Sequence, residues 1–105
     1  MLSDAQISEL KAKHGPIRKL SADGRSVIIR RATEAEWMVF LGYSTDDNKR
    51  LSAMRTLLDK VVVYPEAPAF AAMVAELPGL VQTFATHATE FSGFLEAKAV
   101  EKQDL

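Results

Sequence analysis

The segment IRKLSADGRSVIIRRA, residues 17–32, decides the fold of the first third of the chain. Two runs of β-favouring residues, Ile17–Ala22 and Arg25–Ala32, stand on either side of the dipeptide Asp23-Gly24. Such a dipeptide readily adopts the positive backbone angles of a type I′ turn, which joins antiparallel strands through a two-residue loop. The segment therefore predicts a β-hairpin.

The length of this loop also predicts how the two strands pair. With two residues in the loop, Ala22 faces Arg25 and Leu20 faces Val27. A two-stranded hairpin is only marginally stable in water by itself. We therefore expect either that helices cover the hairpin or that its free edges pair with another chain.

A helix is predicted before the hairpin. Ser3 and Gln6 form a capping box, in which the serine hydroxyl accepts from a backbone N–H and the glutamine reaches back. Gly15 and Pro16 end the helix. Its apolar stripe is narrow, so we expect residues 1–15 to form a loosely docked N-terminal arm.

A second capping box, formed by Thr33 and Glu36, opens the helix that follows the hairpin. This helix carries five consecutive apolar residues, Trp37–Leu41. Such a run covers most of the circumference of a helix. We therefore expect this helix to be central to the fold, with Trp37 in the core.

Apolar positions at helical spacing predict three more helices. A valine-rich run that ends at Pro65 predicts an extended exit from the first of them, and Pro78 is expected to begin the last. The last set of apolar positions has the spacing of a short coiled-coil seam. The three sets are Leu51, Met54, Leu58 and Val61; Phe70, Met73, Val74 and Leu77; and Leu80, Phe84, His87, Phe91 and Phe94.

The fold class predicted for residues 1–105 is a single domain, mainly α with an N-terminal β-hairpin, which is an α+β fold built around a small helical bundle. Within it, the arm is followed by the hairpin at 16–32 and the bundle at 33–95. A charged, frayed tail is expected at 96–105.

Composition argues against several classes of protein. The chain has no cysteine, which excludes disulfides, thiolate metal sites and cysteine nucleophiles. The first residues lack the basic and apolar regions of a signal peptide. The longest apolar run in a predicted helix is far shorter than the roughly 20 residues that span a bilayer. We therefore expect a cytoplasmic protein without a membrane partner.

Neither a catalytic nor a metal site is expected. The two histidines are far apart, and no motif joins either of them to a nucleophile. His87 and Glu90 stand one helical turn apart, but a metal ion needs three or four ligands and no second pair exists. His87 is therefore expected in the core or an interface. Residues 46–48 lack the glycine and distal glutamate of a calcium loop, so we expect them to cap the next helix. We predict that the protein is not an enzyme and has no cofactor.

Two surfaces remain as candidates for binding a partner. Residues 17–31 carry a local charge of +4, whereas the remainder carries −5. This basic hairpin is either a solvated surface whose arginines prevent edge aggregation or a docking surface for an acidic protein segment, with nucleic acid less favoured. An exposed part of the last helix would offer an apolar patch to a partner helix, although core is favoured for Phe84. The candidate partner-binding residues are Arg18, Arg30, Arg31, Leu80, Phe84, His87, Phe91 and Phe94.

Three segments, in order, resemble those of small phage and prophage tail assembly chaperones. Ile28–Trp37 resembles a strand that runs into a threonine-capped helix, Leu57–Pro65 is similar to their valine-rich helix exit, and Leu77–Leu80 to their entry into the last helix. Members of this family bind the long, aggregation-prone tape-measure protein, help the tail tube to assemble and then leave. The resemblance covers roughly residues 28–93 and implies a tail assembly chaperone whose partner is the tape-measure protein or another tail protein.

A chaperone of this kind needs apolar surface for its client. We expect the last helix and the helix at 51–61 to supply that surface, with the basic hairpin steering the client or joining copies into a homo-oligomer. Two alternatives stay open. One is a structural virion or neck component that remains in the particle, and the other, less favoured, is a DNA-binding regulator that uses the hairpin as a wing.

Overall fold

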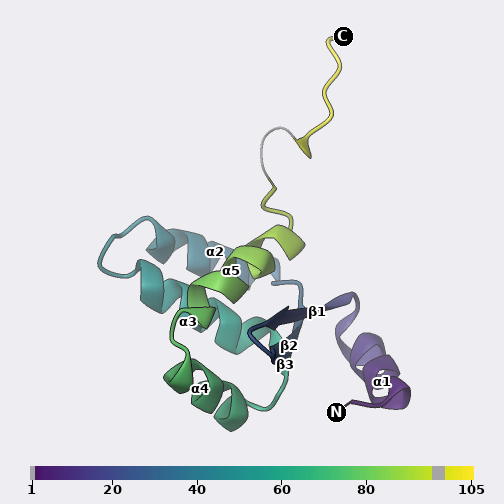
Figure 1. The fold of residues 1–105 in the computed structure, drawn as a ribbon. Helices are drawn as coiled ribbons and strands as arrows, with labels where there is room; N and C mark the ends of the chain where they lie inside the picture. Colours follow the sequence, from purple (N-terminus) through teal and green to yellow (C-terminus); the bar gives the residue numbers. More distant parts are fainter. Residues whose placement is uncertain (1, 96–98) are drawn as a thin grey trace.

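Five helices and a three-stranded antiparallel sheet make up the part of the chain that the computed structural model describes, residues 2–95 and 99–105 (Figure 1). This arrangement confirms the predicted fold class, mainly α with an N-terminal β-hairpin. In chain order, the elements are α1 (Asp4–His14), β1 (Ile17–Ala22), β2 (Arg25–Arg30), α2 (Glu34–Ser44), α3 (Arg50–Val61), β3 (Val62–Tyr64), α4 (Ala67–Glu76) and α5 (Leu80–Phe91).

The hairpin has the predicted turn and register. Leu20 pairs with Val27 and Ala22 pairs with Arg25, and both turn residues have positive φ angles, 50° at Asp23 and 74° at Gly24. The valine-rich exit from α3, predicted only to be extended, is a third strand that pairs with the other edge of β2. The central strand of the sheet is therefore β2, which explains why three consecutive residues, 27–29, are buried in it.

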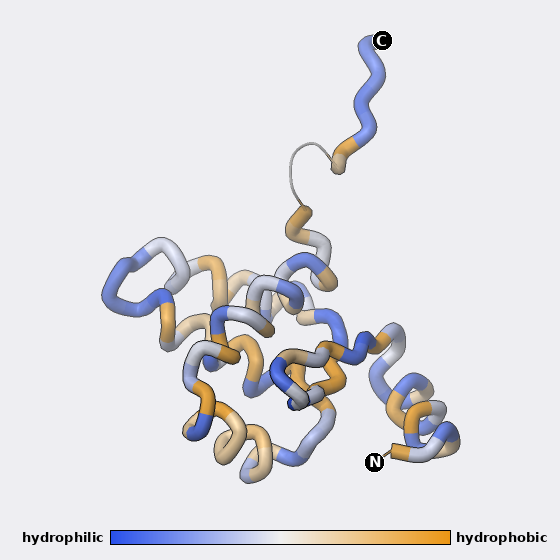
Figure 2. The backbone as a smooth tube through the Cα atoms, viewed as in Figure 1, coloured by the Kyte–Doolittle hydropathy of each residue, from blue (hydrophilic) through white to orange (hydrophobic). Residues whose placement is uncertain are grey.

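One face of the sheet carries the core, which residues of α3, α4 and α5 complete. Figure 2 colours the backbone by hydropathy, and apolar segments occur in the strands and in these helices. Leu20, Val27 and Ile29 belong to this face. Burying a large apolar side chain stabilises a fold by about 1.5–3 kcal/mol. The most deeply buried large side chains of the core are Phe70, Phe84, Ile29, Leu58, Val27 and Val61.

Only part of the apolar seam predicted for the last helix lies in that helix and is buried. The helix α5 follows Gly79 and ends at Phe91, so Pro78 lies before it and Phe94 lies beyond it. Two alanines at positions 85 and 88 are buried instead of His87, because their small side chains lie on the side that packs against α3. The exposed position of His87 shows that it is not a core residue, and its place in an interface stays a prediction.

The predicted central position of α2 is wrong. No residue of α2 is buried, and Trp37 is only partly covered. The physical reason is that α2 packs mainly against one neighbour, α3, and a single helix covers only one side of it. A run of five apolar residues therefore leaves apolar side chains in solvent, Met38 among them at 60% exposed.

Other predicted elements differ in detail. The helix α1 has the predicted capping box and no buried residue, and Figure 1 shows it beside the sheet and apart from the other helices. On α3, Leu51 is exposed, whereas Ala53 and Leu57 join the buried face. The residue that caps α3 is Lys49, without a side-chain cap, because the carboxylate of Asp46 accepts from the backbone of its own loop. Of the predicted frayed tail, residues 96–98 lie outside the described residues.

Candidate protein-binding groove

An apolar groove of about 420 Å³ lies between α2 and α3. The helix α2 supplies one wall, because four of its uncharged residues recur at helical spacing on one side of the helix. Three charged residues, Glu36, Lys49 and Lys60, stand among otherwise uncharged side chains. The uncharged lining consists of Ala35, Val39, Phe40 and Tyr43 from α2, with Ser52, Ala53, Thr56 and Leu57 from α3.

Several apolar side chains of these two helices are exposed, and two of them border the groove. Val39 and Tyr43 are about half exposed, and each also lines the groove. Single exposed apolar residues are ordinary, but exposed apolar residues beside an apolar groove add to the apolar surface that the groove presents. The exposed large apolar residues of these two helices are Met38, Val39, Leu41, Tyr43 and Leu51.

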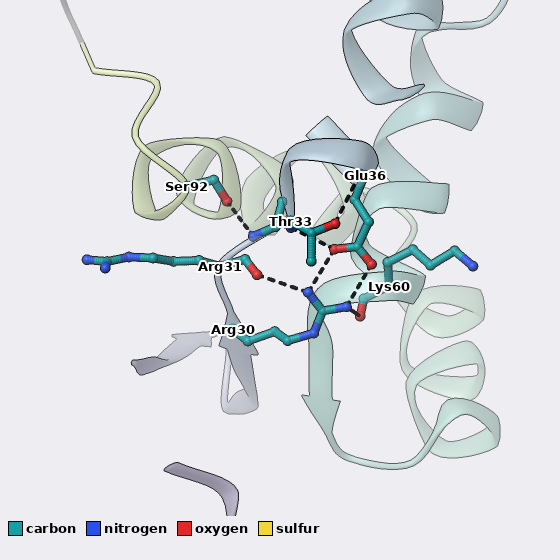
Figure 3. Close-up of polar contacts among 7 residues, drawn as sticks. Arg30, Arg31, Thr33, Glu36, Lys60 and Ser92 are labelled. Carbon is teal, nitrogen blue, oxygen red and sulfur yellow. Dashed lines mark hydrogen bonds and ion pairs between the residues drawn. The ribbon is translucent and has the colours of Figure 1, made fainter. Parts of the chain in front are cut away.

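A polar network holds the first turn of α2, and with it one end of the groove, to the sheet (Figure 3). Both nitrogens of the Arg30 guanidinium group donate to the Glu36 carboxylate at 2.8 Å. The same group donates to the backbone carbonyls of Arg31 at 2.9 Å and Lys60 at 2.8 Å. Glu36 also accepts from the backbone N–H of Thr33 at 2.9 Å, which completes the predicted capping box. The network therefore joins the ends of β2 and α3 to the start of α2.

This network changes the electrostatics at the groove end. The hydrogen bonds from Arg30, supported by the capping bond from Thr33, lower the pKa of Glu36 from 4.5 to about 2. The carboxylate is therefore ionised at neutral pH, and its charge is matched by the guanidinium group. It follows that the two lysines dominate the charge of the groove.

The candidate arginines of the hairpin have partners within the chain. Arg31 donates to the backbone carbonyl of Phe91 at 3.0 Å, where a helix leaves carbonyl groups without intrahelical partners. The guanidinium carbons of Arg18 and Arg31 lie 4.4 and 4.9 Å from the centroid of the Phe91 ring, which is a cation–π arrangement. The candidate residues Arg18, Arg30 and Arg31 thus connect the sheet to α2 and α5, while Arg18 and Arg31 remain exposed. Their role in binding a partner stays a prediction.

The candidate residues of the last helix are also placed differently from the expectation. Leu80, Phe84 and Phe91 are buried in the core, because α5 turns this side toward the sheet and α3. Their side chains are not open to a partner, which corrects their selection as partner contacts. His87 is exposed, with its Nδ1 atom 3.5 Å from the Glu90 carboxylate.

Phe94 is 65% exposed, and its ring packs against Trp37 with centroids 5.9 Å apart. It also lines a second hollow beside α5, together with Phe40 and Met54. Of the predicted apolar contacts, Phe94 is thus the one that the structure leaves open to a partner. Sequence reasoning missed the α2 side of the groove, although the run Trp37–Leu41 was a usable signal for it.

Among residues 2–95 and 99–105, no three His, Asp or Glu side chains gather into a group that could hold a metal ion. In the same part of the chain, the helices are too short or too polar to cross a membrane.

Comparison with known proteins gives information on the fold alone. No protein-family model matches this chain, and no curated protein is similar to it. A solved structure of an uncharacterised protein from Bacillus stearothermophilus is similar over 90% of this chain and 99% of that chain. The TM-score is 0.76 and the sequence identity is 21%. The chain therefore shares its small α+β fold with this protein.

Proposed function

We propose that the protein is a non-enzymatic protein-binding factor that acts as a phage tail assembly chaperone and binds the tape-measure protein during tail assembly. The observation that carries the proposal is the α2 helix, which has five consecutive apolar residues and no buried one. In a small domain, such a helix is stabilised when another apolar segment covers it. The groove between α2 and α3 gives that segment a place to bind.

The contact surface in this proposal differs from the one expected from the sequence. The apolar side of α5 is used for the core, so α2 and α3 bind the client. The client is an apolar helical segment, because a groove between two helices accepts the side chains of one face of a third helix. The tape-measure protein as the source of that segment rests on the resemblance of residues 28–93 to tail assembly chaperones.

The shape of the groove is also compatible with later release of the client. The groove is open along the surface and about half of each of the Val39 and Tyr43 side chains is exposed, so the client is not enclosed. Contacts of this kind bury limited area, and the ordering cost of binding offsets a large part of their free energy. The client is therefore held reversibly until tail assembly removes it.

The test is co-expression with the tape-measure protein and the other tail proteins encoded beside it, followed by affinity capture of this chain. A soluble complex should form and should be lost when Val39 and Tyr43 are both changed to serine. The matched control is Ile7→Ser, because Ile7 is an exposed apolar residue on α1, away from the groove. Circular dichroism should give the same helix content for all three proteins.

Two outcomes contradict the proposal. If the serine variant captures the tape-measure protein as well as the wild-type chain does, the groove is not the binding surface. If no tail protein is captured and the chain is found in purified particles, it is a structural virion component.

A further inference from the structure

The charges at the groove indicate what kind of helix it accepts. Glu36, Lys49 and Lys60 are the charged residues among those that line it in the described part of the chain. Arg30 neutralises Glu36 through two hydrogen bonds of 2.8 Å. No ion pair of Lys49 or Lys60 is found within residues 2–95 and 99–105. The groove therefore presents two positive charges that have no acidic partner in these residues.

These two charges stand at opposite ends of the groove. Lys49 precedes the first residue of α3, and Lys60 lies in its last turn, eleven positions later. At a rise of 1.5 Å per residue, eleven positions correspond to about 16 Å, or three helical turns. The ammonium group of Lys49 lies 5.3 Å from the centroid of the Tyr43 ring, so this charge is held directly over the apolar wall.

We infer that the groove binds an amphipathic helix whose apolar stripe, about three turns long, is flanked at each end by an acidic residue. This inference rests on the proposed function and specifies the client segment. Apolar residues at positions i, i+4 and i+7 of the client would contact Val39, Phe40 and Leu57. Its acidic residues, about eleven positions apart, would pair with Lys49 and Lys60.

The same charges argue against a second copy of this chain bound face to face. In a two-fold symmetric dimer through this groove, the lysines of both copies would come together. Like charges brought together at a contact oppose association. A partner with acidic residues has the opposite effect, since attraction by Lys49 and Lys60 adds to the burial of the apolar stripe.

The experiment uses two synthetic peptides that differ only in charge. Both carry leucines at helical spacing over three turns, with either glutamate or lysine at two positions eleven residues apart. Fluorescence anisotropy at low salt measures their binding to the wild-type chain and to the double variant Lys49→Glu, Lys60→Glu. A second double variant, Lys11→Glu, Lys13→Glu, makes the same change of charge on α1 and is the matched control.

The wild-type chain should bind the glutamate peptide about three- to tenfold more tightly than the lysine peptide, as expected for two partly exposed charge pairs. The groove variant should reverse this preference, and the α1 variant should keep it. Raising the salt concentration should reduce the preference, because exposed charges are screened. Equal affinities of the two peptides, no binding of either, or an equal effect of the α1 variant would overturn the inference.

Capture of the tape-measure protein distinguishes a failure of this inference from a failure of the proposed function. If capture of that protein depends on Val39 and Tyr43 but is unchanged in the Lys49→Glu, Lys60→Glu variant, the function stands and the inference is wrong. If the glutamate peptide binds with the expected preference but the tape-measure protein is not captured, the inference stands and the client assignment is wrong.

Discussion

Replacing Arg30 with methionine is expected to destabilise the fold strongly, because one guanidinium group connects three elements. Methionine keeps much of the side-chain stem and removes the charge and the donors. The change removes two hydrogen bonds to Glu36 and those to the carbonyls of Arg31 and Lys60. It also leaves the Glu36 carboxylate without its cation.

The structure sets the size of this effect. Breaking a buried ion pair by removing one partner costs about 3–5 kcal/mol, and an exposed pair contributes about 0–1 kcal/mol. The side chains of Arg30 and Glu36 are 18% and 19% exposed, so they lie nearer the buried limit. We expect a loss of about 2–3 kcal/mol in the free energy of unfolding. For a domain of this size, that lowers Tm by about 10–20 °C.

The assay is urea unfolding at pH 7, followed by far-UV circular dichroism. The matched control is Arg50→Met, because Arg50 pairs with Asp47 at 2.7 Å but the two side chains are 49% and 88% exposed. This control should lose less than about 1 kcal/mol. If the two variants lose the same free energy, the Arg30 network does not hold α2 to the sheet and the reasoning is refuted.

Three more predictions follow from single residues. Since the pKa of Glu36 is lowered to about 2, the contribution of its carboxylate to the free energy of unfolding is complete above pH 4.5 and is lost as the pH falls toward 2. Unfolding measured over this acid range should show the loss for the wild-type chain and a smaller loss for Glu36→Gln. Phe84→Ala should lower the free energy of unfolding by about 3–5 kcal/mol, because Phe84 is buried, whereas Phe94→Ala should lower it by less than about 1 kcal/mol. Thermal unfolding compares the two variants, and similar losses would contradict the burial of Phe84 and the exposure of Phe94. Gly24→Ala should lower the free energy of unfolding by about 1–2 kcal/mol, because Gly24 has a φ of 74° that alanine adopts at a cost, and no neighbouring atom within 4 Å adds a clash. An unchanged urea midpoint would argue against the type I′ turn.

Features set by residues close together in the chain were predictable from the sequence. Asp23-Gly24 fixed the hairpin turn, and with it the pairing of Leu20 with Val27. The capping boxes that begin α1 and α2 form as predicted. The capping bonds join residues three positions apart, and the turn joins Ala22 to Arg25, so their geometry depends little on the remainder of the fold.

The tertiary structure alone decided which apolar residues are buried and which lie in solvent. Trp37–Leu41 and the seam from Leu80 to Phe94 both have enough apolar residues to form a core, and the two segments are far apart in sequence. Because the sheet has a limited apolar face, α5 covers it and α2 is left at the surface with the groove beside α3. The same long-range packing brings Lys60 and Glu36 to Arg30. Burial is a competition between distant segments for the same surface, and the spacing of residues within each segment does not determine its outcome.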